Sequence, residues 1–270
     1  MLLSGKVAFI TGAARGQGRN HAVRLAREGA SIIAIDACGA VAPANKYPAA
    51  TEEDLATTVG LVEAEGQKIL ARRADVRDSA ALEQIVADGV AEFGGRLDVV
   101  VANAGISNWN RFWEMPDDQW QNMIDINLTG VWRTLKAAVP AMIAAGNGGS
   151  IITVSSVAGI KSLPAQAHYS AAKHGVVGLT KSAAIELGEY GIRVNSVHPW
   201  GVTTPMGEDP TIETILTEHP NYLASFGSLL PGLPIAESDD ISDGVLWLAS
   251  DMSRAVTGTQ LTLDMGATKV

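Results

Sequence analysis

The sequence predicts a single-domain α/β fold, in which a doubly wound parallel sheet of about seven strands carries helices on both faces. Short runs rich in β-branched residues alternate with longer Ala-rich amphipathic segments along the whole chain. Several short runs are apolar at every position, as strands covered on both faces must be. The 270 residues are 47% hydrophobic, which is enough apolar material for a sizeable core. No repeat or linker divides the chain, so we expect residues 1–270 to form one domain.

Seven short segments have the composition of strands. In chain order they are residues 7–10, 31–35, 69–74, 97–102, 150–154, 192–197 and 260–263.

Six amphipathic segments lie between the strands and predict helices. They are residues 17–28, 52–65, 79–93, 117–145, 166–190 and 238–249. Thr51 and Asp54 have the spacing of a capping box at the second helix, with Asp in place of the usual Glu. Glycines stand where a left-handed residue would end a helix, namely Gly29, Gly66, Gly94, Gly146 and Gly191.

Two long segments interrupt the alternation. Residues 37–50, rich in Ala and Pro, form an insertion after the second strand, and residues 203–238 form an excursion before the last helix. Loops of this length inside a compact domain are usually lids or mobile segments. We expect residues 203–238 to act as a substrate-side lid.

Composition excludes several classes of partner. The net charge is −9 and no basic cluster is present, which disfavours nucleic acid and anionic membranes. The apolar stretch at residues 137–145 is too short to cross a bilayer, and the N-terminus does not resemble a secretory signal. The single cysteine, Cys38, is typical of a reducing compartment. We therefore expect a cytoplasmic protein.

A glycine-rich segment follows the first strand and opens the first helix. Gly12, Gly16 and Gly18 have the spacing Gly-x-x-x-Gly-x-Gly. Glycines let the backbone turn tightly and bring N–H groups close to a pyrophosphate, whose charge the helix N-terminus favours. The position between a strand and a helix favours a nucleotide site over a ligand-free turn.

Polar residues end the next strands. Asp36 follows the second strand, where a carboxylate can accept both ribose hydroxyls of adenosine and repels a 2′-phosphate, so NAD is favoured over NADP. Asp36 alone could equally be a solvated strand end. Asp75 follows the third strand, and Asn103-Ala104-Gly105 follows the fourth. Ligands bind at this edge of open parallel sheets.

Tyr169 and Lys173 stand four residues apart in a predicted helix and therefore share one face. An ammonium beside a phenol stabilises the phenolate, so we expect Lys173 to lower the pKa of Tyr169 toward the range of a general base. Ser156 lies just after the fifth strand, where its hydroxyl could hold a substrate oxygen. These residues predict an acid/base site.

In this order, and over nearly the whole chain, the motifs resemble the short-chain dehydrogenase/reductase family. The resemblance rests on the glycine-rich turn, Asn103-Ala-Gly105, residues 126–130, Ser155-Ser156-Val157, Tyr169-x-x-x-Lys173 and residues 198–206. It implies a Rossmann-type sheet, NAD as cofactor, and a homotetramer built on the helices near 117–145 and 166–190. It further implies four catalytic roles: Tyr169 as general acid/base, Lys173 lowering its pKa and binding the nicotinamide ribose, Ser156 orienting the substrate oxygen, and Asn127 holding a water in a proton relay.

The resemblance also implies a set of cofactor contacts. They are Gly12, Arg15, Gly16, Gln17, Gly18, Asp36, Asp75, Val76, Asn103, Ala104, Gly105, Tyr169, Lys173, Pro199, Gly201, Val202, Thr204 and Met206.

One departure from the family pattern follows the sixth strand. The family usually has Pro-Gly there, whereas this chain has Pro199-Trp200-Gly201. Either Thr203 or Thr204 could therefore be the residue that contacts the nicotinamide.

A narrower resemblance is to the mycofactocin-coupled dehydrogenases, a subgroup that includes carveol dehydrogenases. It is carried by the segment from Gly12 to His21, the insertion with Tyr47-Pro48, and the segment from His198 to Met206. It implies that NAD is tightly held, that residues 37–50 close near the adenosine instead of forming a plain solvent loop, and that an external electron acceptor reoxidises the cofactor. The substrate would be a small hydrophobic alcohol or ketone, such as a terpenoid.

Other residues receive simpler interpretations. We expect His21 to be a capping or packing residue, and His168 not to be the base. No His and carboxylate cluster has metal-ligand spacing, so no catalytic metal is expected. Seven residues in loops at the ligand edge are either core or the wall of a hydrophobic pocket: Trp109, Phe112, Trp113, Met206, Phe226, Leu229 and Leu230.

The leading hypothesis is an NAD-dependent dehydrogenase that interconverts a hydrophobic secondary alcohol and its ketone. The alternative is a catalytically silent NAD-binding redox sensor or scaffold. A sensor needs only the nucleotide half, so the intact set of Ser156, Tyr169 and Lys173 favours the enzyme. A nucleotide-sugar epimerase shares Tyr-x-x-x-Lys but normally has a larger substrate domain.

Overall fold

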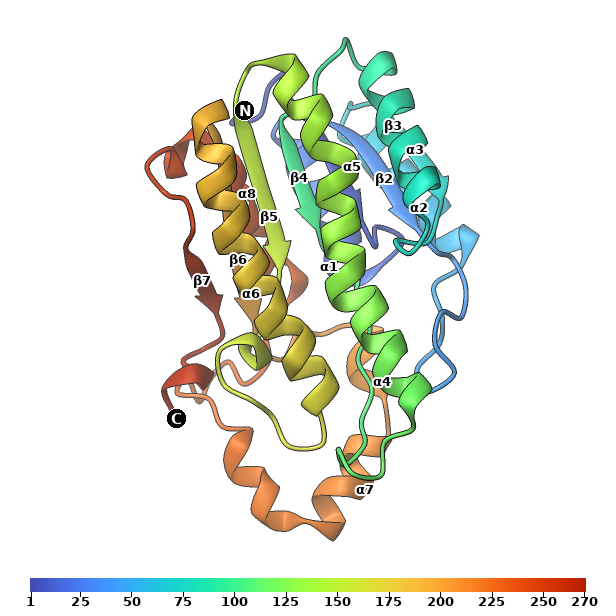
Figure 1. Cartoon of the computed structure of the whole chain (residues 1–270), viewed down its shortest axis with the longest axis vertical. Helices are drawn as coiled ribbons and strands as arrows, with labels where there is room; N and C mark the ends of the chain where they lie inside the picture. The colour runs from blue at the N-terminus through green and yellow to red at the C-terminus, as the bar shows by residue number, and fades with distance from the viewer.

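The seven expected strands form one parallel sheet in the computed structural model, which describes residues 1–270 (Figure 1). The strands are β1 (Val7–Thr11), β2 (Ser31–Asp36), β3 (Ile69–Arg73), β4 (Val99–Ala102), β5 (Gly149–Val154), β6 (Ile192–Pro199) and β7 (Gln260–Leu263). Their order is β3-β2-β1-β4-β5-β6-β7. The chain therefore winds outward in both directions from β1 and β4, and the predicted doubly wound sheet is confirmed.

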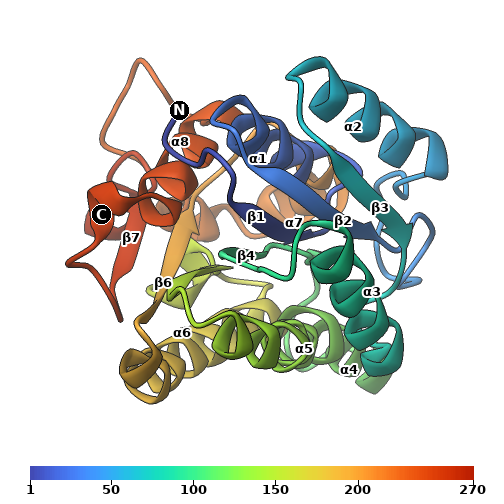
Figure 2. The same cartoon turned by 90° about the horizontal axis from the view of Figure 1, so that it is seen from above.

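Helices cover both faces of the sheet, as strands apolar on both faces require (Figure 2). One face carries α1 (Gly16–Arg27), α2 (Glu52–Ala64) and α8 (Ser238–Ala249). The other carries α3 (Ser79–Glu92), α4 (Asp117–Ile124), α5 (Gly130–Ala145) and α6 (Ala167–Leu187). Short 3₁₀ turns complete the chain at Val157–Gly159, Gly188–Tyr190, Pro205–Glu208, Pro220–Ser225, Asp251–Ser253 and Ala267–Lys269. None of the helices combines the length and apolar composition that crossing a lipid bilayer requires.

Alternation along each strand divides the core into two layers. Phe9 and Ile33 enter the larger cluster of buried apolar side chains, whereas their neighbours Ile10 and Ile32 enter the second cluster on the opposite face. The sheet is thus buried on both sides, and only its edges and ends are open to ligands.

Most local expectations are met. The five glycines expected at helix ends all have positive φ, between 66° at Gly146 and 98° at Gly29. Thr51 and Asp54 form the capping box, with each side chain accepting the other residue's backbone N–H at 3.1 and 3.0 Å. Strand ends differ from the predicted ones by a residue or two.

The long helix expected over residues 117–145 is interrupted. A π-helical turn, Asp125–Thr129, separates α4 from α5. The wider turn faces Asn127 inward, where its side chain accepts from the Ile106 N–H at 2.8 Å and donates to the Ile106 carbonyl at 2.7 Å. These two hydrogen bonds join the turn to the loop after β4, which offsets the poorer geometry of a π turn.

The excursion at residues 203–238 is more ordered than a plain loop. It contains a helix, α7 (Thr211–Glu218), which the sequence analysis did not predict. This segment lies beyond the carboxyl ends of the strands, at the bottom of Figure 1.

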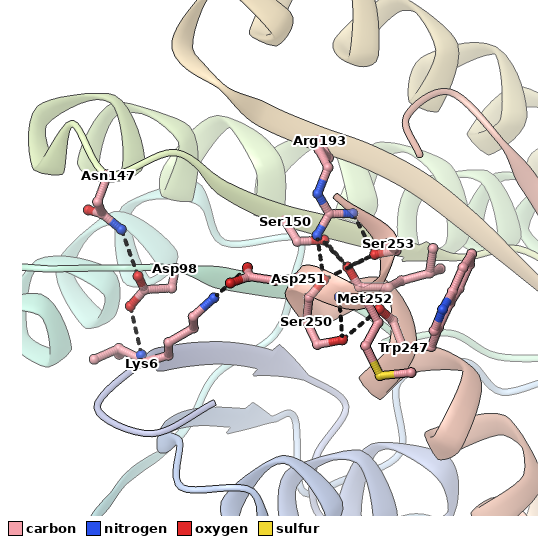
Figure 3. Close-up of polar contacts among 12 residues, drawn as sticks. Lys6, Asp98, Asn147, Ser150, Arg193, Trp247, Ser250, Asp251, Met252 and Ser253 are labelled. Carbon is pink, nitrogen blue, oxygen red and sulfur yellow. Dashed lines mark hydrogen bonds and ion pairs between the residues drawn. The ribbon is translucent and has the colours of Figure 1, made fainter. Parts of the chain in front are cut away.

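At the opposite, amino edge of the sheet, Arg193 joins β6 to the end of α8 (Figure 3). Its guanidinium donates to the carbonyls of Leu248 at 2.8 Å and Ser250 at 3.2 Å, and to the Ser253 hydroxyl at 2.8 Å. The Ser150 hydroxyl donates to the same Leu248 carbonyl at 2.7 Å. The cation thus satisfies carbonyls that the helix end leaves without intrahelical partners.

A second polar group ties the amino edge of β1 to its neighbours. The buried Asp98 carboxylate accepts from the Val7 N–H at 2.9 Å and from the Asn147 side chain at 2.6 Å. Lys6 pairs with Asp251 at 3.3 Å (Figure 3). This edge is therefore held by polar contacts between distant parts of the chain.

We expect Arg193→Met to lower the free energy of unfolding by about 1–3 kcal/mol, because buried carbonyls lose charged donors. Urea unfolding measures the loss. Arg254→Met is the matched control, since Arg254 is exposed on the turn that follows α8. Equal losses in the two variants would contradict the role given to Arg193.

Candidate active site

A cavity of about 540 Å³ opens at the carboxyl ends of the strands. Its wall comes from the turn after β1, the ends of β2 to β6, α6, the insertion and the excursion. All eighteen residues expected to contact a cofactor line it, and so does Ser156. Asn127 does not line the cavity and lies buried behind its wall.

The three glycines of the glycine-rich turn stand where a side chain would be disfavoured. Gly12 and Gly16 have positive φ, 70° and 56°. A Cβ on Gly18 would lie 1.9 Å from the Gly12 carbonyl oxygen, so only glycine allows α1 to pack this closely on the turn. No side chain caps the N-terminus of α1, and its first turn carries no acidic residue. The amide groups there are suited to an anion such as a pyrophosphate.

Asparagine and threonine side chains hold the turn against β4. The Thr11 hydroxyl accepts from the N–H groups of Asn103 at 3.1 Å and Ala104 at 3.0 Å. The Asn103 side chain donates to the carbonyls of Thr11 at 3.0 Å and Gly12 at 3.2 Å. The role of Thr11 cannot be read from its local sequence, because its contacts are to a segment some ninety residues away.

The acidic residues at the strand ends already make hydrogen bonds or ion pairs within the protein. The Asp36 carboxylate accepts from the N–H groups of Ala14 at 3.0 Å and Cys38 at 3.1 Å, which orients it beside the glycine-rich turn. Asp75 is paired with Arg77 at 2.6 Å. Gln17 has a buried side-chain oxygen without a hydrogen-bond partner. A polar ligand could satisfy that oxygen, so this end of the cavity fits a nucleotide.

The insertion at residues 37–50 bridges the glycine-rich turn. It leaves β2 and reaches the segment after β4, where the Tyr47 hydroxyl accepts from the Ser107 N–H at 3.2 Å. The Asn108 side chain donates to Asn45 at 2.9 Å, and Arg15 of the turn donates to the Pro48 carbonyl. Since β1 lies between β2 and β4, the insertion crosses over the turn between them.

Tyr169 and Lys173 share the face of α6 that borders the cavity, as their spacing predicts. Lys173 Nζ lies 5.5 Å from the centre of the Tyr169 ring and donates to the Val154 carbonyl at 2.8 Å. Ser156 lines the same end of the cavity and accepts from the Ala158 N–H at 3.1 Å. The three side chains therefore meet as expected.

The expected lowering of the tyrosine pKa is wrong for the protein alone. Burial raises the pKa of Tyr169, although a hydrogen bond with Ser156 acts in the other direction. Lys173 does not reverse this shift, because its Nζ is directed to the Val154 carbonyl, and burial lowers the pKa of Lys173 itself to about 8. A nearby positive charge or a further hydrogen bond to the phenolate would lower the phenol pKa.

Three histidines, His21, His168 and His198, are buried and hydrogen-bonded. Burial lowers the pKa of His168 to about 4, and its Nε2 contacts Asn108 Oδ1 at 2.7 Å. His21 is a packing residue, with Nδ1 2.7 Å from the Ser242 hydroxyl. His198 was missed by the sequence analysis, and its Nδ1 lies 2.8 Å from the Ser156 carbonyl oxygen.

Aromatic rings form one wall of the cavity near Tyr169. Phe226 lies between Trp109 and Trp200, with ring centres 6.1 and 5.9 Å apart. We call the part of the cavity lined by these rings, Ser156 and Tyr169 the substrate end. Of the residues expected as core or wall, Trp109, Met206 and Phe226 line the cavity, whereas others are exposed, namely Phe112, Trp113, Leu229 and Leu230.

Comparison with known proteins agrees with this geometry. The family model described as short chain dehydrogenase matches residues 6–213. A Mycobacterium tuberculosis protein named as an NAD-dependent oxidoreductase is 57% identical over 272 residues, which cover 99% of this chain and 97% of that protein. A (−)-trans-carveol dehydrogenase of Rhodococcus erythropolis is 45% identical over 275 residues, covering 98% of each chain. The crystal structure of a short chain dehydrogenase from Mycobacterium paratuberculosis bound to NAD superposes with a TM-score of 0.97 at 46% identity and covers 100% of both chains.

The buried Lys173 makes stability depend on pH. Its pKa is about 8 in the folded protein and 10.5 in an unfolded chain. Between these values the unfolded chain binds a proton that the folded chain does not, so the folded state gains stability as the pH rises. Below about pH 8 the folded protein carries the full cost of the buried charge, about 3 kcal/mol.

We therefore expect Lys173→Met to gain stability relative to the parent protein at neutral pH, and this advantage to shrink as the pH rises from 8 toward 10.5. Urea unfolding at several pH values measures the difference. Lys181→Met, at an exposed position of α6, controls for removal of a lysine. A difference that does not change with pH would refute the argument.

Proposed function

The chain belongs to the short chain dehydrogenase family, and we propose that it is an NAD-dependent dehydrogenase that interconverts a hydrophobic secondary alcohol and its ketone. The observation that carries the proposal is the shape of the one cavity. A glycine turn suited to a pyrophosphate lies at one end, and Tyr169, Ser156 and Lys173 stand beside an aromatic wall at the other.

Residues of the cavity wall would hold NAD in a defined orientation. The turn from Gly12 to Gly18 would bind the pyrophosphate, and Asp36 the adenosine ribose. Lys173 would bind the nicotinamide ribose, and Thr204, which lines the cavity whereas Thr203 does not, the carboxamide. The Asp36 carboxylate disfavours a 2′-phosphate, which supports NAD over NADP.

In the proposed reaction, side chains of the protein position the substrate and transfer its proton. Ser156 would orient the alcohol oxygen, and Tyr169 would take its proton as general base, or return it in the reverse direction. When bound, oxidised NAD supplies the hydride acceptor and a positive charge. That charge is of the sign needed to offset the burial that raises the pKa of Tyr169.

Asn127 is proposed to hold a water in the relay behind the tyrosine. Its Oδ1 is the nearest atom, at 3.0 Å, to a Cβ built on Gly105, and Lys173 Nζ lies 3.6 Å from the same point. The amide and the ammonium are thus neighbours on the far side of the catalytic residues.

The substrate class follows from the aromatic wall. Three rings and Met206 offer apolar contact, and Ser156 with Tyr169 offers the polar contact that fixes one oxygen. A compact alcohol of terpenoid type, similar to carveol, satisfies both, and the carveol dehydrogenase of Rhodococcus erythropolis supports this choice.

We propose two lids over the cavity. Residues 37–50 would close over the adenosine end, supported by the contacts of Tyr47 and Asn45 with the segment after β4. Residues 203–238 would close the substrate end, supported by Phe226 between two tryptophans. A cofactor retained under the first lid would pass its electrons to an external acceptor.

A homotetramer and a cytoplasmic location complete the proposal. Trp120, Trp132 and Ile185 lie on α4, α5 and α6 with exposed fractions of 41%, 46% and 83%, and would be covered by partner subunits. The single cysteine, Cys38, supports a reducing compartment.

The alternative, a silent NAD-binding sensor, is disfavoured by the substrate end. A sensor has no need of a tyrosine, a serine and a buried lysine converging on a second, apolar part of the cavity.

We expect Tyr169→Phe to lower kcat by about 10² to 10⁴-fold or more, because the phenol that accepts the proton is lost. NAD binding and unfolding should stay near the parent values. Turnover is followed by the absorbance of reduced nicotinamide with a panel of cyclic secondary alcohols. Tyr190→Phe, at an exposed tyrosine, is the control. Near-normal turnover of Tyr169→Phe would refute the mechanism.

We expect NAD to remain bound through purification, and Tyr47→Phe to release it up to about tenfold faster, because the hydroxyl that accepts from the Ser107 N–H is lost. The nucleotide is quantified after denaturing the purified protein, and the off-rate by dilution into excess competitor.

Lys46→Ala, at an exposed position of the same insertion, should leave the off-rate unchanged. A parent protein that purifies empty would overturn the lid proposal and leave the dehydrogenase proposal standing.

A further inference from the structure

We propose that the substrate end of the cavity selects uncharged ring alcohols and rejects those that carry a carboxylate, with Phe226 as the specificity-determining residue. The inference rests on the proposed function and specifies the substrate class of the same site. It depends on the charged side chains that line the cavity or lie near it, and on the ring faces of the aromatic wall.

Only two cationic side chains line the cavity, Arg15 and Lys173. Arg15 belongs to the glycine-rich turn at the nucleotide end and donates to the Pro48 carbonyl. Lys173 donates to the Val154 carbonyl beneath the catalytic residues. Neither is available to a charged group on the ring of a substrate whose hydroxyl is held by Ser156 and Tyr169.

Two further cations lie near the substrate end, but both are engaged elsewhere. Lys161 Nζ donates to the carbonyl oxygen of the last residue, Val270, at 3.0 Å. Its Nζ also lies 5.8 Å from the centre of the Trp200 ring, and Lys161 does not line the cavity. Arg111 is paired with Glu114, and its guanidinium contacts His219 Nε2 at 3.2 Å.

The excursion, residues 203–238, contains acidic side chains and no Lys or Arg. Asp209 is 3% exposed and precedes α7. Its Oδ1 accepts from the Thr211 N–H at 3.0 Å, and its Oδ2 has no hydrogen-bond partner. Asp209 does not line the cavity, and the excursion contains no Lys or Arg that could pair with a carboxylate on a substrate.

The aromatic wall also disfavours a carboxylate on the substrate. The faces of aromatic rings carry partial negative charge, so they attract cations and repel anions, and the rings also offer apolar contact. Phe226 is the central ring, between Trp109 and Trp200. A carboxylate placed against these rings would lose its hydration without gaining a counter-ion.

The test compares two substrates that differ in charge, 4-hydroxycyclohexanecarboxylate and its methyl ester, with the NAD-loaded protein. We expect kcat/KM for the carboxylate to be lower by at least about 100-fold, the size expected for an unpaired buried charge. Because the ester is larger than the carboxylate, a cavity that excluded substrates by size would give the lower kcat/KM for the ester. Values within about threefold of each other would overturn the inference.

A matched pair of variants tests the assignment to Phe226. Phe226→Lys adds a cation, and Phe226→Met removes the ring without adding charge. We expect the ratio of kcat/KM for carboxylate over ester to rise at least about tenfold in Phe226→Lys relative to Phe226→Met. Equal ratios in the two folded variants would overturn the role of Phe226.

A measurement on the parent protein keeps the inference testable if Phe226→Lys does not fold. 4-Hydroxycyclohexanecarboxylate and its methyl ester are compared by their displacement of cyclohexanol, so that both molecules carry the ring hydroxyl that Ser156 and Tyr169 would hold. Weaker binding of the carboxylate by at least about 100-fold supports the inference, and equal binding overturns it. If no uncharged secondary alcohol is oxidised at all, the proposed function fails, an outcome distinct from oxidation of both substrates.

Discussion

The parallel direction of the strands is the constraint on which the rest of the molecule depends. Because all seven strands run the same way, every strand delivers the residue that follows it to the same edge. Residues as distant in the chain as Gly12, Asp36, Asn103, Ser156 and Trp200 therefore line one cavity without any special folding of the loops. The amino ends of the strands meet at the other edge, where Arg193 and Asp98 hold the chain together.

Within this frame, packing at the glycine-rich turn and burial at the proposed catalytic residues act together. Gly18 lets α1 approach the Gly12 carbonyl, which puts uncapped amide groups at the cavity. At the other end, burial lowers the pKa of Lys173 and raises that of Tyr169, so both groups are less charged than in water. A positive charge brought to this site by a ligand would favour the phenolate of Tyr169.

The sequence predicted the fold and the convergence of Ser156, Tyr169 and Lys173 because both follow from local periodicity. Tyr169 and Lys173 share a helix face because they are four residues apart. Gly12 and Gly18 stand at a strand-to-helix junction that the local sequence alone indicates. The sequence did not predict the π turn at Asn127, since the contacts with Ile106 that favour it form only after folding. The contacts of Thr11, Tyr47 and His198 were not predicted for the same reason, because their partners are distant in sequence. The predicted lowering of the pKa of Tyr169 was wrong, because sequence spacing reveals neither the burial of the phenol nor the direction in which the Lys173 ammonium points.

The polar ties at the amino edge have a consequence for how such a protein can change over evolutionary time. Arg193, Ser150 and Asp98 join strands and helix ends at a distance from the cavity, and none of them lines it. Mutations in the excursion that carries Phe226 therefore act on one edge of the sheet, while much of the polar support lies at the other. Substitutions in the loops at the cavity can therefore change which substrates fit while the contacts of Arg193, Ser150 and Asp98 stay in place.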